Sequence, residues 1–203
     1  MRHIISALCV AAGAIAFTSC NEKAKLADSL TGTWSSAPER IATADTRATT
    51  TVERTLTFLN DESSNTGGDV DATVKFSILT GTQLQAADVQ PISITAEGTA
   101  SVSGRWEATD DDEIVVNWNF STLKVNVDPD AVSLDYDVVT QNDSETLMTL
   151  KPAVIKALTA TISSAMPTEV FNFGKVDDIK FINNSTSLKC EIGDKDYVFN
   201  RLL

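Results

Sequence analysis

The feature of this sequence that most constrains its fold is a strict alternation of apolar and polar residues between positions 70 and 78. The apolar positions are Val70, Ala72, Val74, Phe76 and Ile78. Because successive side chains of a β-strand point to opposite faces, the pattern predicts a strand with one buried face and one face in water. Strands of this kind are typical of antiparallel sheets.

The same alternation recurs along the rest of the chain. It is clearest on either side of Asp110–Asp112, where residues 100–108 and 114–120 predict a hairpin whose apolar sides face the same core. The parity of the apolar positions changes after Phe120, which predicts a bulge or tight turn near Ser121. Further strands are expected in segments 52–58, 92–94, 123–127, 132–138, 179–181, 188–192 and 197–201.

One late segment has the spacing of an amphipathic helix instead. Its apolar positions, at intervals of three and four, are Ile155, Leu158, Ile162 and Met166. Pro152 suits the first turn of such a helix, and Pro167 is expected to end it. Many short strands with polar turns and one late helix favour a closed or nearly closed antiparallel barrel with the helix packed on the sheet, since closure removes exposed strand edges.

The N-terminus has the organisation of a secretory signal. Arg2 and His3 precede an apolar run from Ile4 to Phe17, and small residues then lead to Cys20. The run is shorter than the roughly 20 residues that a membrane-spanning helix needs, so we expect it to be cleaved.

The end of this signal, Phe17-Thr18-Ser19-Cys20, resembles the lipobox of bacterial lipoproteins. The resemblance implies that residues 1–19 are removed, that the Cys20 sulfur takes a diacylglyceryl group, and that the new amine is acylated, for which palmitate is expected. Residues 20–29 would then be the lipidated cysteine and a tether. The protein would be anchored in the bacterial cell envelope, at the outer membrane, on either its periplasmic face or the cell surface. The alternative is an ordinary signal peptide with a chance cysteine.

The composition of the processed chain excludes several classes of function. Once Arg2 is removed, 15 basic residues face 28 acidic ones, a net charge of −13 that argues against nucleic acid as a partner. The same charge is repelled by an anionic membrane, so attachment must come from the lipid. His3 is the single histidine and leaves with the signal, which removes Ser/His/Asp and Cys/His catalysis and the commonest zinc ligand. We therefore expect no enzyme, no cofactor and no metal site.

A second resemblance concerns the fold. Gly32-Thr33-Trp34 near the start, the succession of strands, and Arg201 in the final strand resemble the lipocalin-like lipoproteins of Bacteroides-type bacteria. The resemblance implies one lipocalin-like barrel over residues 30–203, with Trp34 closing one end and Arg201 lying on its ring. It also implies that the protein binds a small apolar molecule or a partner in the envelope.

Four aromatic residues are candidates for lining a ligand cavity. Trp106 and Trp118 lie on the apolar faces of adjacent predicted strands, and Phe58 and Phe76 lie on the apolar faces of two others. A cavity for a small apolar ligand is lined mainly by such side chains. The same rings can instead fill the interior, in which case the protein would have a structural or interaction role and contact a protein or glycan through its loops.

The remaining candidates have simpler explanations. Asp110–Glu113, and separately Asp128, Asp130, Asp135 and Asp137, offer oxygen ligands that suit calcium, but their spacing matches no calcium loop and solvated turns explain them equally. Carboxylate pairs of the kind used in glycoside hydrolysis are expected by chance in so acidic a chain. Cys190 alternates with apolar neighbours, so it should lie in the core as an inert thiol.

Overall fold

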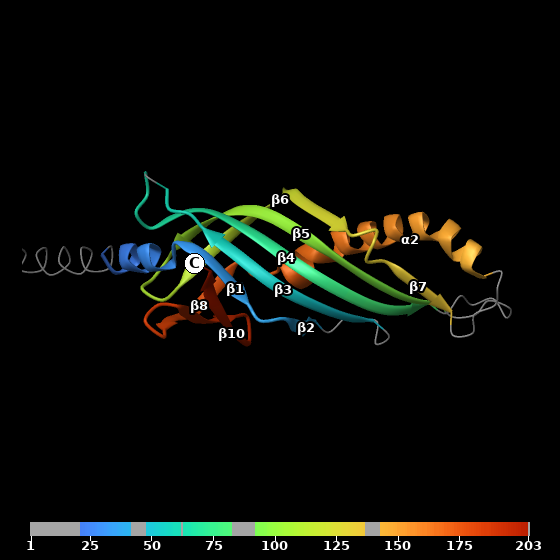
Figure 1. The fold of residues 1–203 in the computed structure, drawn as a ribbon. Helices are drawn as coiled ribbons and strands as arrows, with labels where there is room; N and C mark the ends of the chain where they lie inside the picture. Colours follow the sequence, from blue (N-terminus) through green and yellow to red (C-terminus); the bar gives the residue numbers. More distant parts are fainter. Residues whose placement is uncertain (1–20, 42–47, 62, 83–91, 137–142, 203) are drawn as a thin grey trace, which may run out of the picture.

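The computed structural model describes residues 21–41, 48–61, 63–82, 92–136 and 143–202, and in this part of the chain the fold is mainly β (Figure 1). Within these ranges, ten strands form one antiparallel sheet. A long helix packs on the sheet, as the sequence predicts. The strands are β1 (Gly32–Ser36), β2 (Glu39–Ile41), β3 (Thr49–Phe58), β4 (Gly67–Thr82), β5 (Ile92–Ala108), β6 (Ile114–Val127), β7 (Ser133–Tyr136), β8 (Lys175–Ile182), β9 (Ser187–Ile192) and β10 (Lys195–Leu202). Cys20, the signal segment and Asp137 lie outside the described residues.

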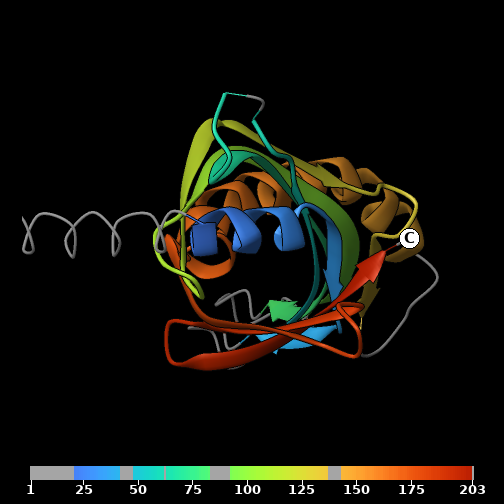
Figure 2. The ribbon, with the colours of Figure 1, turned by 90° about the vertical axis from the view of Figure 1, so that its left-hand side faces the viewer.

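The sheet closes on itself through a ring of hydrogen-bonded strands. The short strand β1 pairs with β10 on one side and with β3 on the other. The pairings therefore run in a closed circuit through β1, β10, β9, β8, β6, β5, β4 and β3. Figure 2 looks along this ring. β2 pairs with β3 and β7 pairs with β5, and neither β2 nor β7 is part of the closed circuit. The closure expected from the edge argument is thus present in the backbone pairing.

The two longest strands, β4 and β5, pair from Gly67–Glu107 to Thr82–Ile92. The expectation of separate strands at 92–94 and 100–108 is therefore wrong, because β5 runs through both. The alternation looked interrupted because Gly98 occupies an inward position. A Cβ built on Gly98 would lie 2.5 Å from the Phe76 ring on the paired strand, so the aromatic side chain fills the space that Gly98 leaves. Gly104 stands opposite Trp118 in the same way.

The predicted irregularity near Ser121 is confirmed. Ser101 pairs with Lys124 but Ser103 pairs with Asn119, so β6 carries extra residues between these positions. The Thr122 hydroxyl accepts a hydrogen bond from the Ser103 N–H (2.9 Å), which replaces the missing strand partner. One consequence contradicts the expected face of Phe120, because the bulge leaves this ring 41% exposed.

The helix α2 (Asp143–Ala165) is longer than the predicted one and leads directly into a single π-helical turn, η1 (Met166–Val170). Pro152 lies inside α2, so its placement in the first turn is wrong. Pro167 does not end the helical path either, because it lies within the first two residues of η1, which continues directly from α2. The predicted apolar stripe does face the sheet, with Ile162 and Met166 buried.

The segment assigned as a tether contributes to the core. Residues 21–30 are helical, and Leu26, Ala27 and Leu30 are at most 4% exposed. Figure 2 shows this helix crossing the end of the ring. The sequence predicts a tether up to residue 29, whereas the structure buries Leu26 and Ala27 at the end of the ring. Of the helices in the described ranges, none has both the length and the apolar character needed to cross a membrane.

Candidate functional site

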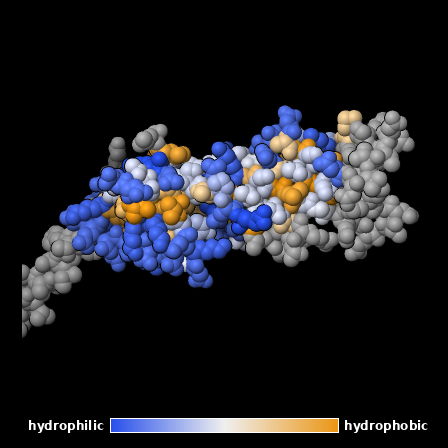
Figure 3. Space-filling view, turned by 60° about the horizontal axis from the view of Figure 1, so that its bottom comes forward, coloured by the Kyte–Doolittle hydropathy of each residue, from blue (hydrophilic) through white to orange (hydrophobic). Residues whose placement is uncertain are grey.

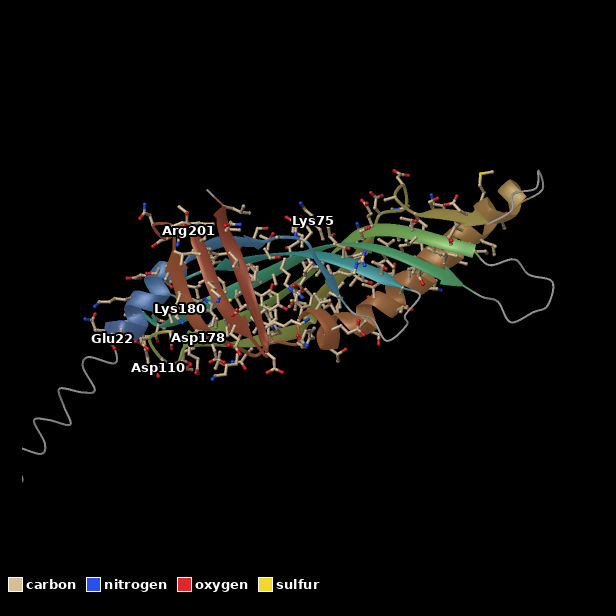
Figure 4. The ribbon with its side chains drawn as sticks, turned by 90° about the horizontal axis from the view of Figure 1, so that it is seen from below. Glu22, Lys75, Asp110, Asp178, Lys180 and Arg201 are labelled. Atoms are coloured by element: carbon tan, nitrogen blue, oxygen red, sulfur yellow. The ribbon has the colours of Figure 1, made fainter. Side chains whose placement is uncertain are left out.

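Trp34 and Arg201 close the end of the ring that helix 21–30 crosses. Trp34 is fully buried on β1 and pairs in register with Arg201 on β10. The Arg201 guanidinium carbon lies 4.5 Å from the centroid of the Trp34 ring, a cation–π distance. Figure 4 shows Arg201 at the end of the molecule that helix 21–30 occupies, with Lys75 further along the sheet. The contact expected from the sequence is therefore present.

The same two side chains satisfy the end of helix 21–30. The last carbonyls of a helix have no partner within it, and they carry the negative end of the helix dipole. The Trp34 indole N–H donates to the Leu30 carbonyl (2.7 Å), and the Arg201 guanidinium donates to the Ser29 carbonyl. Gly32, with φ +129°, makes the sharp turn from the helix into β1.

Trp106 lies inside the ring, whereas Trp118 lines a separate surface pocket of about 320 Å³. Trp106 is 2% exposed, packs edge-on against Phe58 (5.5 Å between centroids) and donates its indole N–H to the Leu59 carbonyl. Trp118 is half-buried, packs against Phe171 and Phe173, and donates to the Phe173 carbonyl (2.9 Å). Each ring therefore has its own aromatic neighbours and a satisfied N–H. The structure does not bring the two tryptophans together around a shared cavity.

An apolar pocket of about 330 Å³ lies elsewhere, between α2, η1 and the strands β2, β3 and β4. Its lining is Ile41, Ala48, Thr50, Phe76, Ile78, Thr80, Leu158, Thr161, Ile162, Ala165, Met166, Glu169 and Val170. Figure 3 shows apolar residues on the surface in both halves of the molecule, including the half toward α2. Of the four aromatic residues proposed as ligand-lining, Phe76 belongs to this pocket, whereas Trp106, Trp118 and Phe58 do not.

The pocket was not predicted because its wall is assembled from distant segments. The helix stripe Leu158, Ile162 and Met166 was recognised, but its partner surface was not. Ile78 and Thr80 lie at the end of β4, where it extends along α2 instead of turning back at the ring. The strand pattern gave no signal for the pocket, because Ile78 continues the alternation that begins at Val70 and pairs with Thr50 on β3.

A buried arginine, Arg54, also faces the interior from β3. Its side chain forms an ion pair with Glu39 on β2, and its guanidinium carbon lies 5.6 Å from the Tyr197 ring centroid. Burying an unpaired charge would be strongly unfavourable, so Glu39 makes this position tenable. Arg54 shares the inward face of β3 with Val52 and Leu56, and the apolar pattern does not predict a cation there.

The outer face of β4, β5 and β6 carries a polar groove of about 700 Å³. Arg105 lies in it and forms ion pairs with Asp61 (2.9 Å) and Asp69 (3.2 Å). Hydrogen bonds from the Ser63 backbone and hydroxyl, and then from Arg105, lower the pKa of Asp61 to about 2. Asn117 and Asn119 line the same groove. These residues are the outward-facing half of the alternation and are well solvated.

The acidic turns are held by ordinary ion pairs. The Lys175 ammonium lies 2.7 Å from both Glu113 and Asp177, and the hydrogen bonds from Lys175 and Thr109 lower the pKa of Glu113. The Asp128 side chain accepts a hydrogen bond from the Asp130 N–H (2.9 Å), which is a local turn contact. Within the described ranges, no cluster of three or more acidic, cysteine or histidine residues has metal-binding geometry.

Cys190 lies in the core, as its alternation with apolar neighbours predicts. It is 2% exposed, and burial, with a smaller contribution from the charge of Asp196, raises the pKa of its thiol to about 12. Because the thiolate is the reactive form, this cysteine is inert near neutral pH.

Comparison with known proteins gives no assignment, since neither a protein-family model nor a curated protein matches this sequence.

Arg201→Met should weaken the fold by about 1–3 kcal/mol in free energy of unfolding, because it removes the cation from Trp34 and the donor from the Ser29 carbonyl while keeping the aliphatic stem. Urea unfolding measures the change. Lys180→Met is the matched control, since Lys180 pairs with Asp178 on the exposed surface. Equal midpoints for the two variants would contradict this account of the ring end.

Proposed function

We propose that this protein is a lipid-anchored lipoprotein of the bacterial envelope, with a lipocalin-like barrel that binds a small apolar molecule between the sheet and α2. The observation that carries the proposal is the apolar pocket of about 330 Å³. Sites for small ligands start at roughly 300 Å³ and are lined mainly by apolar groups with a few polar ones. The three threonines and Glu169 among the lining residues fit that description.

The lipocalin-like part of the proposal is supported by three features that occur together. The strand pairing forms a closed ring, β1 begins at a positive-φ glycine, and an arginine from the last strand lies on the tryptophan of the first. These features match the arrangement that the resemblance implies. The ligand position differs from the expected one, because the interior near Trp106 and Trp118 is occupied by Phe58, Phe171 and Phe173.

The filled interior favours a second candidate, an interaction lipoprotein that contacts a glycan or protein through its outer surface. The polar groove on β4–β6 offers Asn117 and Asn119 amides beside the Arg105 guanidinium, groups that hydrogen-bond sugar hydroxyls well. In this alternative the pocket beside α2 would have no ligand. Ligand binding to the pocket therefore separates the two candidates.

Membrane attachment is proposed to depend on Cys20. Each buried methylene of an acyl chain contributes about 0.8 kcal/mol, and two or more chains give stable anchoring. Cys20→Ala should therefore release the protein from the membrane fraction or leave residues 1–19 attached. Intact-mass spectrometry of the membrane-bound protein checks the modification. An unmodified Cys20 on protein that still sediments with membranes would contradict the anchor.

Filling the pocket should abolish ligand binding. Ala165 lines the pocket, so Ala165→Phe should weaken the affinity for the apolar fluorophore N-phenyl-1-naphthylamine at least ~10-fold, equivalent to about 1.4 kcal/mol. Ala160→Phe is the matched control, because Ala160 is exposed on the same helix and does not line the pocket. Binding that is equal in both variants, or undetectable in the unmodified chain, would contradict the proposed site.

A further inference from the structure

The described residues that line the α2 pocket carry charge of one sign only, which is negative. Glu169 is the single ionisable side chain among its lining residues in the described part of the chain. It is exposed, and it stands next to Val170 and three residues after Met166, both buried in the pocket wall. The carboxylate is therefore held at the rim, directly beside the apolar lining. No ion pair to Glu169 is formed by any described residue.

The nearby buried cation does not compensate this charge. Arg54 on β3 is paired with Glu39, faces Tyr197 and does not line the pocket. The remaining polar groups of the lining are the hydroxyls of Thr50, Thr80 and Thr161, which accept hydrogen bonds as well as donate them. Among the described residues, the lining thus offers acceptors and a negative charge to the polar end of a ligand, and no positive group.

From this charge pattern we infer that the ligand is an amphiphile with a hydrocarbon body and a cationic head group, an inference that rests on the ligand-binding function proposed above. The hydrocarbon body lies against Ile78, Leu158 and Met166, and the ammonium lies at the rim beside Glu169. A fatty-acid carboxylate in the same place meets a like charge, and the described lining offers it hydroxyls but no cation. The whole-chain net charge of −12 disfavours anions further and raises the local concentration of cations.

A matched series of ten-carbon compounds tests this inference. Decylamine, decanol and decanoate share the hydrocarbon body and differ in head-group charge at pH 7. Each is titrated against N-phenyl-1-naphthylamine bound to the full chain carrying Cys20→Ala, so that no attached acyl chain competes. We expect decylamine to bind at least ~10-fold more tightly than decanoate and several-fold more tightly than decanol, with a preference that falls as salt is added.

Two substitutions at the rim assign the preference to one carboxylate. Glu169→Gln should bring decylamine to the affinity of decanol, and Glu169→Lys should favour decanoate over decylamine. Glu191→Gln on β9 is the control, since it removes the same charge away from the pocket and should leave the order unchanged.

The outcomes separate the two levels of the proposal. Decanoate or decanol binding as tightly as decylamine overturns the inferred head group while leaving the binding function intact. An amine preference that survives Glu169→Gln overturns the role of Glu169. Failure of all three compounds to displace the fluorophore, or failure of the fluorophore to bind, overturns the ligand-binding function itself.

Discussion

The arrangement of this molecule depends on the contact between Arg201, Trp34 and the end of helix 21–30. β1 has five residues, yet it supplies both closing pairings of the ring, to β10 and to β3. Arg201 serves three purposes there, because it covers the Trp34 ring, donates to the Ser29 carbonyl and places positive charge at the negative end of a helix dipole. The pairing of β6 with β8 is shorter than either pairing of β1, since it is made through Ile114–Val176 and Val115–Lys175.

The ring and the pocket occupy different halves of the same sheet. Around the ring, aromatic side chains such as Trp106 and Phe58 fill the interior and leave no shared cavity between the two tryptophans. β4 and β5 continue beyond the short strand β1, and the end of β4 faces α2 and η1 across the pocket, while α2 itself contacts β6 and β7. The ring therefore stabilises the fold, and the part of β4 beyond β1 forms one wall of the pocket.

Much of the fold followed from the period of the apolar residues, because one buried face leaves a clear two-residue repeat. The bulge near Ser121 could be predicted from the change of parity in the apolar positions. The contact of Trp34 with Arg201 could be predicted from the resemblance to lipocalin-like lipoproteins. The continuity of β5 was hidden because Gly98 is inward-facing but contributes no side chain, its space being filled by Phe76. The pocket and the core role of Leu26 could not be predicted, since both depend on which distant segments meet.

Native-state amide hydrogen exchange tests most directly whether β1 locks the sheet into one cooperative unit. Amides of β1, β10 and the centre of the β4–β5 pair should all exchange with the free energy of global unfolding, because opening the ring at β1 exposes the buried Trp34. Exchange of β8–β10 at a clearly lower free energy than β4–β5 would contradict this account, since it would show that the last three strands open without the ring.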